Sequence, residues 1–559
     1  MIDLKAKPFY LDDAQIAWIN STIDSMTNEE LIGQLFMPIG FSGDSDYLDN
    51  VILSKHVGGI MYRNGEKEEM QATHRYLQEH SKVPLLIGSN LEYGGNGAAI
   101  EGTFVGTQMQ IAATGSFHHA YELGEVAAKE GKAVGVNWAF APVCDIDMNW
   151  RNPITNYRTY GNNPDTVLEC ASNYVKAALK EGVIVSPKHF PGDGWDEVDQ
   201  HILTGVNGLT PEQWDNTYGK IYKGLIDIGV PAIMIGHIAQ PAYEKALGGQ
   251  AFPLRPATLS PTLLQELLRK KLGFNGLIIS DSSCMVGFSC AMERKKAVPY
   301  TIEAGCDILL FNKDIAEDYD YMLNGLKEGI LSKKRLIDAV TRILALKAFA
   351  GLCNKDSKEI VPNSDALNII GCDEHISWAK EIADESITLV KDTTKVLPIS
   401  PAKTKKVLLE VLGDFPQTPR IENKLSKLLT KEGFDVEIYV HEDFNNADFT
   451  VKTFKEKYDL VLYIANIENT SNMVTNRLSW YTFWGNGNNV PWFVKERPTV
   501  FVSVGNPYHL IDVPMMDTYI NCYGNSDYTL EALVEKLVGH SEFKGNSPID
   551  PFCGKEYLK

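Results

Sequence analysis

The sequence has no run of about 20 apolar residues, the length that a membrane-spanning helix requires. Its first residues, MIDLKAKPFYLDDAQ, have neither a basic n-region nor an apolar h-region, so we expect no secretory signal. The nine cysteines are scattered, without a CxxC pair or a histidine at zinc-like spacing. These absences predict a cytoplasmic protein with reduced thiols, no metal and no membrane contact.

Basic residues are also in deficit, with 53 Lys and Arg against 72 Asp and Glu and a formal net charge of −19. A surface that acidic repels phosphate backbones and anionic lipid heads, which disfavours nucleic-acid and membrane partners. What is present is a globular composition, 44% hydrophobic and 22% charged, over 559 residues. That length favours more than one domain. Small molecules remain the expected partners, and the oligomeric state is left open.

Short apolar runs alternate with amphipathic helical stretches up to about residue 345. The runs cover residues 33–39, 57–62, 83–89, 136–143, 182–190, 230–237, 274–281 and 306–311. Helical patterns such as Phe117–Glu130 and Pro164–Glu181 lie between them. This alternation predicts an α/β fold with a TIM-type (β/α)8 barrel, although a doubly wound open sheet gives the same pattern. No GxGxxG follows the first run, which disfavours dinucleotide binding.

A second α/β unit is predicted beyond the barrel. Residues 1–350 form the catalytic barrel, a polar stretch over 351–375 is the linker, and residues 376–559 form a smaller α/β sandwich domain. Its apolar runs, 406–412, 434–440, 459–466 and 498–505, are typical of buried parallel strands. Residues 476–489 are rich in Trp, Tyr, Asn and Gly. Such a loop either reaches over the barrel mouth and contacts a bound ligand, or packs on the surface of its own domain or at the domain interface.

Polar residues stand at or just beyond the ends of five apolar runs, where a TIM barrel carries its catalytic groups. They are Asn90, Asp145, Lys188 with His189, His237, and Asp281. Any one of these is an ordinary strand-end residue. Because ionisable groups are costly to bury without partners, five of them at one face predict a functional site.

Asp281 follows the apolar run Leu277–Ile279 almost directly. A carboxylate held at a strand tip can attack an anomeric carbon and carry a covalent glycosyl intermediate. The alternative is a helix N-cap, since Asp281 and Ser282 precede a possible short helix.

Asp199 and His201 lie two residues apart in the loop PKHFPGDGWDEVDQH, residues 187–201. That spacing allows a carboxylate to hold one imidazole nitrogen and fix the tautomer of an acid/base histidine. A solvated acidic loop with an incidental histidine is the other interpretation.

The string KHFPGDGWDEVDQH resembles the loop signature of bacterial β-N-acetylglucosaminidases of glycoside hydrolase family 3. Further segments are similar to that family along most of the chain. They are NEELIGQLFM at 28–37, APVCDID at 141–147, NYRTYGNNP at 156–164 and SDSSCM at 280–285. The resemblance implies a barrel followed by an α/β sandwich domain.

The resemblance also implies roles for particular residues. Asp281 matches the nucleophile, His201 the general acid/base, and Asp199 its orienting partner. The matched sugar-binding and pocket residues are Asp145, Arg158, Lys188, His189, His237 and Met285. The implied reaction is double displacement on a small β-linked saccharide or glycoside with retention of configuration, and it needs no cofactor.

Departures from the family pattern leave the substrate open. Asn90 stands where the family has an aspartate that grips the outer sugar hydroxyls, and Gln200 replaces Ser or Thr inside the dyad. The expected substrates are therefore β-N-acetylglucosaminides or β-glucosides. A histidine acid/base does not repel a phosphate dianion as a carboxylate would, so a phosphorylase that uses inorganic phosphate and releases a sugar 1-phosphate is the leading alternative. A catalytically silent sugar-binding protein is the second.

Overall fold

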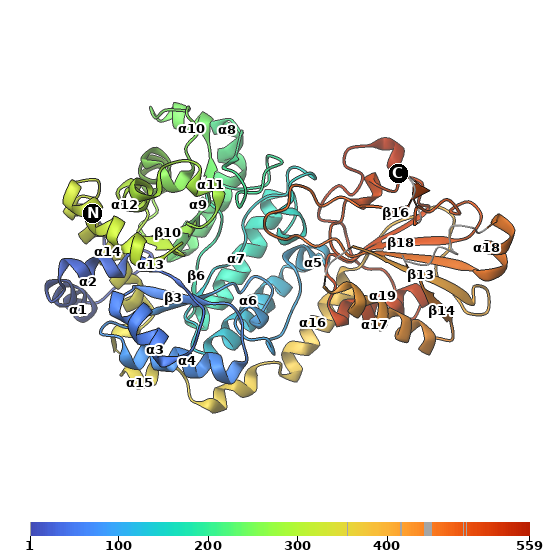
Figure 1. Ribbon diagram of the computed structural model, residues 1–559, viewed down its shortest axis with the longest axis horizontal. Coiled ribbons are helices and arrows are strands. Elements are labelled where there is room, and N and C mark those ends of the chain that lie inside the picture. The colour runs from blue at the N-terminus through green and yellow to red at the C-terminus, as the bar shows by residue number, and fades with distance from the viewer. Residues whose placement is uncertain (1, 355, 414–415, 441–449, 484–485, 488) are drawn as a thin grey trace. The chain divides into compact units, whose positions relative to one another are not determined.

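The computed structural model describes residues 2–354, 356–413, 416–440, 450–483, 486–487 and 489–559 (Figure 1). Contacts divide the chain into two compact units. Unit 1 comprises Met1–Val105, Phe117–Thr155 and Asn162–Ile376. Unit 2 comprises Gly106–Ser116, Asn156–Gly161 and Ser377–Lys559.

Each of the eight apolar runs of the first half contains strand. The strands are β1 (Phe36–Met37), β2 (Ile39–Gly40), β3 (Gly59–Tyr62), β4 (Leu86–Ser89), β5 (Trp138–Ala139), β6 (Ile184–Val185), β8 (Ala232–Ile235), β10 (Leu277–Ser282) and β11 (Ile308–Leu310). Nearly all of their residues are buried, because helices cover the outer face while the inner face packs on itself.

The strands of unit 1 close into a parallel barrel. One sheet has the order β2-β3-β4-β5-β6 and the other the order β1-β11-β10-β8. A parallel bridge from Phe190 to Ile235 joins β8 to the chain that follows β6. At the other seam β1 and β2 are separated only by Pro38. Strands adjacent in sequence are thus adjacent in space, which confirms the predicted TIM-type barrel and excludes the open sheet for this unit.

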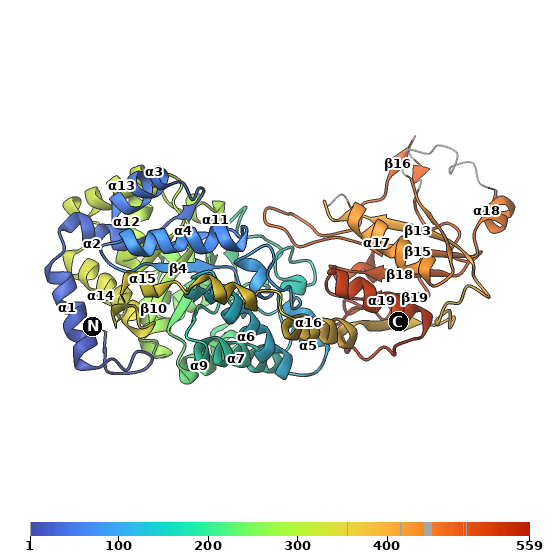
Figure 2. The ribbon, with the colours of Figure 1, turned by 90° about the horizontal axis from the view of Figure 1, so that it is seen from below.

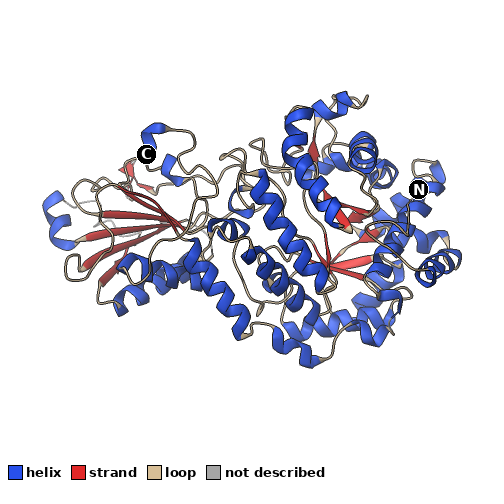
Figure 3. Cartoon of the chain, turned by 180° about the vertical axis from the view of Figure 1, so that it is seen from behind, coloured by secondary structure: helices blue, strands red, loops and turns tan. Residues whose placement is uncertain are grey.

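Helices surround these strands (Figure 3). The longer ones in unit 1 are α1 (Asp13–Asp24), α2 (Asn28–Gln34), α4 (Lys67–His80), α6 (His118–Ala133), α7 (Pro164–Lys180), α9 (Lys220–Ile228), α12 (Arg294–Ala304), α13 (Ile315–Glu328) and α14 (Lys333–Phe349). The predicted helical stretches correspond to α6 and α7. These two helices pack closely because Gly124 has no side chain: a Cβ there would lie 2.5 Å from the carbonyl oxygen of Tyr174.

Unit 2 is built on one six-stranded sheet of order β12-β19-β18-β15-β13-β14 (Figure 2). The strands are β12 (Thr388–Asp392), β13 (Lys406–Leu412), β14 (Asp435–Ile438), β15 (Leu460–Ala465), β18 (Thr499–Ser503) and β19 (Thr518–Asn521). All neighbours are parallel except β12 with β19. The four predicted runs are therefore parallel strands, but β14 is only half-buried because it forms an edge of the sheet.

Alternate residues of the central strands enter two separate cores, as expected of a sandwich. Val407 and Leu409 pack with helices α17 (Thr418–Lys431) and α19 (Asp527–Val538) on one face. Leu408 and Leu412 pack with Phe454 of α18 (Val451–Lys457) on the other. The predicted α/β sandwich is confirmed.

Helix α16 (Asp373–Ser386) carries the chain from one unit to the other, with the division after Ile376. Residues 351–375 group with unit 1 and include the short helix α15 (Ser357–Ile360). Helix α5 (Gln108–Ala113) groups with unit 2 although barrel segments flank it in sequence. Within the described part of the chain, every helix is too short or too polar to cross a membrane.

Candidate active site

Asp281 is the penultimate residue of β10, at the edge of the barrel where parallel strands end. Its side chain is 14% exposed, and Oδ1 accepts the backbone N–H of Ser282 at 2.7 Å. The short helix α11 (Val286–Ser289) begins only after its N-cap Met285, so Asp281 is a strand residue and not a helix cap.

Histidines surround this carboxylate. Nε2 of His189 lies 3.7 Å from Oδ2 of Asp281. Burial acts to raise the pKa of Asp281, but its electrostatic interactions with nearby histidines, His189 first among them, and the N–H of Ser282 outweigh burial and hold that pKa below its usual value. Asp281 is therefore an ionised carboxylate at neutral pH, as a nucleophile must be.

Asp199 and His201 are in contact. Nδ1 of His201 lies 2.6 Å from Oδ1 of Asp199, and the backbone N–H of His201 donates to the same oxygen at 2.9 Å. The side chain of Asp199 is fully buried while that of His201 is 25% exposed, so this is no solvated acidic loop. Because a carboxylate can only accept, Nδ1 carries the proton of this contact, and Nε2 is the nitrogen that can exchange one with a substrate.

His189 and Lys188 are each held by a buried acid. Nδ1 of His189 donates to Oδ2 of Asp145 at 2.7 Å, and its backbone N–H donates to Oδ1 at 3.1 Å. Nζ of Lys188 lies 2.6 Å from Oε1 of Glu92. Two polar side chains that follow β6 are thus fixed by acids from the segments after other strands, and His189 is the one that contacts Asp281.

His237 is placed next to the nucleophile but turned toward the protein. Its Nε2 donates to the carbonyl oxygen of Ser282 at 2.8 Å, and Nδ1 lies 3.0 Å from the hydroxyl of Thr258. Burial lowers the pKa of His237. Met285 is also buried, and its backbone N–H donates to the same Ser282 carbonyl at 3.1 Å.

Asn90 follows β4 and is exposed, on the same edge of the barrel. Arg158 ends the 3-10 turn Asn156–Arg158, which belongs to unit 2. Its part in the site stays a prediction. So does that of loop 476–489, of which residues 484–485 and 488 lie outside the described chain.

Three buried residues of the site received no role from the sequence. Glu92 pairs with Lys188. Its position just after β4, at a strand end like the other candidates, is the signal that could have identified it. Asp193 donates its backbone N–H to Asp145 at 2.8 Å, and burial beside Asp145 and Asp196 raises the pKa of its carboxyl well above the usual range. Gln200 is also buried, and nothing in its local pattern predicts where its amide points.

A retaining glycoside-cleaving enzyme needs an ionised carboxylate as nucleophile and a second group as acid/base. The barrel supplies the carboxylate at a strand end, and a histidine whose Nδ1 contacts an acid can serve as the second group. Comparisons with known proteins agree. Residues 27–346, which span all the barrel strands, match the model described as glycosyl hydrolase family 3 N terminal domain. A β-N-acetylglucosaminidase/β-glucosidase of Cellulomonas fimi is 42% identical over 99% of both chains. The chain therefore belongs to glycosyl hydrolase family 3 and is a glycoside-cleaving enzyme.

The chain is also similar to solved structures of this kind. A β-glucoside phosphorylase, BglX, superposes with a TM-score of 0.93 at 41% identity, covering 100% of this chain and 99% of that one. A structure of that phosphorylase bound to 2FGlc gives 0.92 at 42% identity, over 99% of both chains. A family 3 β-N-acetylglucosaminidase from Paenibacillus sp. str. FPU-7 gives 0.79 at 25% identity, over 94% and 99%.

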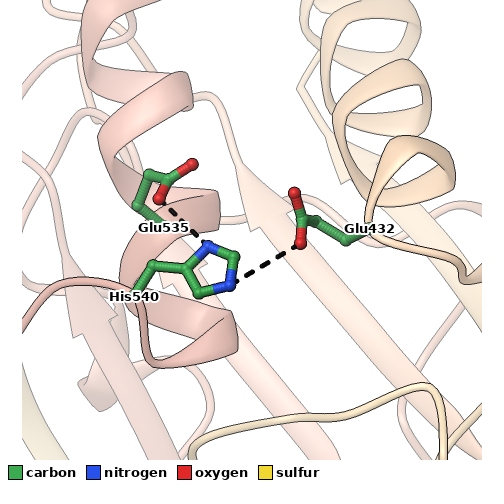
Figure 4. Close-up of side chains that lie close together, drawn as sticks. All are labelled: Glu432, Glu535 and His540. Atoms are coloured by element: carbon green, nitrogen blue, oxygen red, sulfur yellow. Dashed lines mark hydrogen bonds and ion pairs between the residues drawn. The ribbon is translucent and has the colours of Figure 1, made fainter.

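Unit 2 holds a histidine and two glutamates close enough to share an ion (Figure 4). Nδ1 of His540 lies 3.1 Å from Oε2 of Glu535, and its Nε2 lies 3.9 Å from Oε2 of Glu432. The side chains of His540 and Glu535 are each 53% exposed. Because both imidazole nitrogens already face carboxylates, ion pairing accounts for the cluster, and we assign no metal to it.

Proposed function

We propose that this enzyme cleaves terminal β-linked N-acetylglucosamine or glucose from small saccharides, with net retention of configuration. The observation that carries the proposal is the ionised and largely buried Asp281, whose pKa is held low in part by His201, together with the contact of His201 Nδ1 to Asp199. The names of the relatives support both sugars, since one is a β-N-acetylglucosaminidase/β-glucosidase and another a β-glucoside phosphorylase.

In the first half-reaction a carboxylate oxygen of Asp281 bonds to the anomeric carbon. The glycosidic C–O bond breaks, its electron pair passes to the leaving oxygen, and Nε2–H of His201 supplies the proton. Asp199 stabilises the imidazolium from the other side of the ring. In the second half-reaction Nε2 removes a proton from the acceptor, whose oxygen bonds to the anomeric carbon and displaces Asp281.

Sugar hydroxyls are the natural ligands of the buried donors and acceptors beside Asp281. We assign this role to Lys188 and His189, because the acid that each contacts fixes the direction of its side chain. Asn90 is proposed to bind the outer hydroxyls, where an amide both donates and accepts.

A pair of 4-nitrophenyl substrates, the β-glucoside and the β-N-acetylglucosaminide, tests the proposal. We expect nitrophenol release from at least one, and loss of at least about a thousandfold in Asp281→Ala. A protein that binds these sugars but releases nothing from either would instead be the catalytically silent sugar-binding protein. Release that survives intact in Asp281→Ala would exclude Asp281 as the nucleophile.

A second candidate function is phosphorolysis, with inorganic phosphate as the acceptor. It is favoured by the acid/base itself, since His201 becomes neutral in the step in which a carboxylate would repel the incoming dianion. The structural likeness to a β-glucoside phosphorylase supports it. Turnover in the presence of phosphate, followed by 31P NMR, would give a sugar 1-phosphate if phosphate is the acceptor and only free sugar if water is.

We also propose a cytoplasmic location. Among the described residues no disulfide joins any of the nine cysteines, as is usual in a reducing compartment. A sugar phosphate formed there would be retained by the cell. Cell fractionation followed by the nitrophenyl assay tests the location, and activity confined to the medium or envelope fraction would contradict it.

A further inference from the structure

We infer that Gln200 and His237 form a hydrogen-bonded brace that holds the acid/base loop and the nucleophile strand at a fixed separation. Both are thus positioning residues, and His237 is not a ligand of the sugar. The inference rests on the proposed roles of Asp281 and His201. It concerns how the two groups are kept in register, which local sequence does not determine.

The first link is made by the side chain of Gln200. Oε1 of Gln200 accepts the backbone N–H of His237 at 2.7 Å. Its Nε2 lies 3.5 Å from Oδ2 of Asp193, a long hydrogen bond within the same loop. Gln200 is fully buried between Asp199 and His201, so movement of the acid/base histidine away from β8 would break the short bond.

The second link is the imidazole of His237. Nε2 donates to the carbonyl oxygen of Ser282, the residue directly after the nucleophile. Thr258 lies at Nδ1, and the ring is buried, so both nitrogens are used inside the protein. A neutral imidazole satisfies both contacts, with Nε2–H as donor and Nδ1 as acceptor. No nitrogen remains for a sugar hydroxyl.

Backbone hydrogen bonds tie the same two segments directly. The N–H of Val286 donates to the carbonyl of His201 at 3.0 Å, and the N–H of Gly287 donates to the carbonyl of Gln200 at 3.1 Å. The acid/base loop is thereby joined to the start of helix α11, which follows the nucleophile strand. Side-chain and backbone links act at two separate points, as a brace requires.

Two glycines leave the space for this approach. A Cβ on Gly287 would lie 2.5 Å from the carbonyl oxygen of Gln200 and 3.1 Å from Cβ of His237. A Cβ on Gly236 would lie 3.1 Å from Oε1 of Gln200. Neither glycine has a positive φ, so close packing and not backbone conformation requires them.

The brace matters chemically because a retaining mechanism needs its acid and its nucleophile at a fixed short separation across the glycosidic bond. A displacement of about 1 Å can cost about a hundredfold in rate. The glutamine side chain reaches His237 from the dyad loop, and a Ser or Thr at position 200 is too short to span the same distance. This chain therefore carries its own means of fixing the loop.

Two pairs of variants test the brace. Gln200→Met keeps the shape but removes the acceptor, and Gln200→Glu keeps an acceptor for the N–H of His237. His237→Asn loses the donor at the Nε2 position, whereas His237→Gln places an amide N–H there. Buried residues remote from the site supply matched controls. Gln78→Met removes a glutamine that bonds the backbone of Leu85 through both amide ends, and His74→Asn removes a histidine bonded to the carbonyl of Val134.

The measurement is kcat/KM for aryl β-glycosides with good and poor leaving groups, of whichever sugar the wild type cleaves. We expect Gln200→Met to lose about 10- to 100-fold on the poor leaving group and much less on the good one, because protonation by His201 is misaligned. His237→Asn should lose about tenfold or more on both, because the nucleophile is displaced. Gln200→Glu and His237→Gln should recover part of each loss.

The double variant Gln200→Met/His237→Asn separates a brace from two independent contributions. If both residues act through one brace, the double variant loses much less kcat/KM on the poor leaving group than the product of the two single-variant losses. The controls Gln78→Met and His74→Asn should lower the melting temperature but leave the ratio of kcat/KM between the two kinds of substrate unchanged. Two results would overturn the inference. One is a folded Gln200→Met enzyme whose kcat/KM ratio between good and poor leaving groups equals that of wild type. The other is a double variant whose loss equals the product of the two single losses. Absence of any wild-type turnover would instead overturn the proposed function, and this inference with it.

Discussion

His189 and Asp281 lie 3.7 Å apart, between Nε2 of the imidazole and Oδ2 of the carboxylate, although the first follows β6 and the second lies at the end of β10. This contact is a main reason why a buried carboxylate keeps its charge. Burial alone would raise the pKa of Asp281, and the neighbouring imidazoles reverse the direction. The orientation of His189 depends in turn on Asp145, so the reactivity of the site is set partly by a residue that need not touch substrate.

Replacing Asp145 with asparagine should therefore impair the nucleophilic step. In Asp145→Asn the amide N–H₂ faces Nδ1 of His189 in place of an acceptor, which disfavours the Nδ1–H tautomer and its present orientation. We expect kcat/KM on an activated aryl glycoside to fall about 10- to 100-fold. The control is Asp215→Asn, which removes a half-buried acid that pairs with Lys271. A folded Asp145→Asn enzyme with wild-type kcat/KM would refute this role.

Removing the imidazole of His201 should affect substrates according to their leaving groups. Poor leaving groups need the proton, so His201→Ala should lose about 10²- to 10⁴-fold in kcat/KM on a simple alkyl or phenyl glycoside. A dinitrophenyl glycoside needs little acid assistance and should lose far less. Similar losses on the two substrates would show that His201 is not the acid.

The buried pair of Lys188 and Glu92 should be costly to break from one side. Lys188→Met leaves the carboxylate of Glu92 buried without its 2.6 Å partner, and we expect about 3–5 kcal/mol less stability by urea unfolding. The double variant Lys188→Met/Glu92→Gln removes both charges and should recover much of that stability. Equal stabilities of the single and double variants would contradict a coupled pair.

Glu410 should make the stability of unit 2 fall as pH rises from 4.5 to 8. Its carboxyl is buried in β13, and burial raises its pKa to about 8 from 4.5. The folded chain therefore retains this proton when the unfolded chain has lost it, and stability declines as pH rises from 4.5 through 8. We expect Glu410→Gln to gain up to about 3 kcal/mol relative to wild type between pH 4.5 and 7.

Urea unfolding of the wild type and of Glu410→Gln at several pH values gives the difference in their free energies of unfolding. Groups that titrate alike in both proteins cancel in this difference. A difference that is independent of pH would show that Glu410 has an ordinary pKa. Glu422→Gln, at a half-buried position on helix α17, is a matched comparison. A smaller dependence of the same sign is expected there, since burial also raises the pKa of Glu422.

Local sequence was sufficient for the features that repeat along a strand or helix. Every apolar run of the first half became a barrel strand, and Asp199 and His201 needed only a spacing of two residues to meet. The edge position of β14 was not predictable in this way, because its run is as apolar as those of the central strands. Its exposure depends on which strands flank it in the sheet.

By itself the sequence determined an acidic α/β protein and the strand ends that carry its reactive groups, because hydrophobic period and chain direction are local properties. Its alternation of strands and helices fitted both a barrel and an open sheet, and the strand pairing of the structure decided for the barrel. Only the tertiary structure decided which of those groups face one another. His189 meets Asp145 across 44 positions, Gln200 meets the backbone of His237, and residues 106–116 join unit 2. Closure of the barrel brings distant strand ends to one rim, and burial there decides which side chains need partners and which remain to act on a sugar.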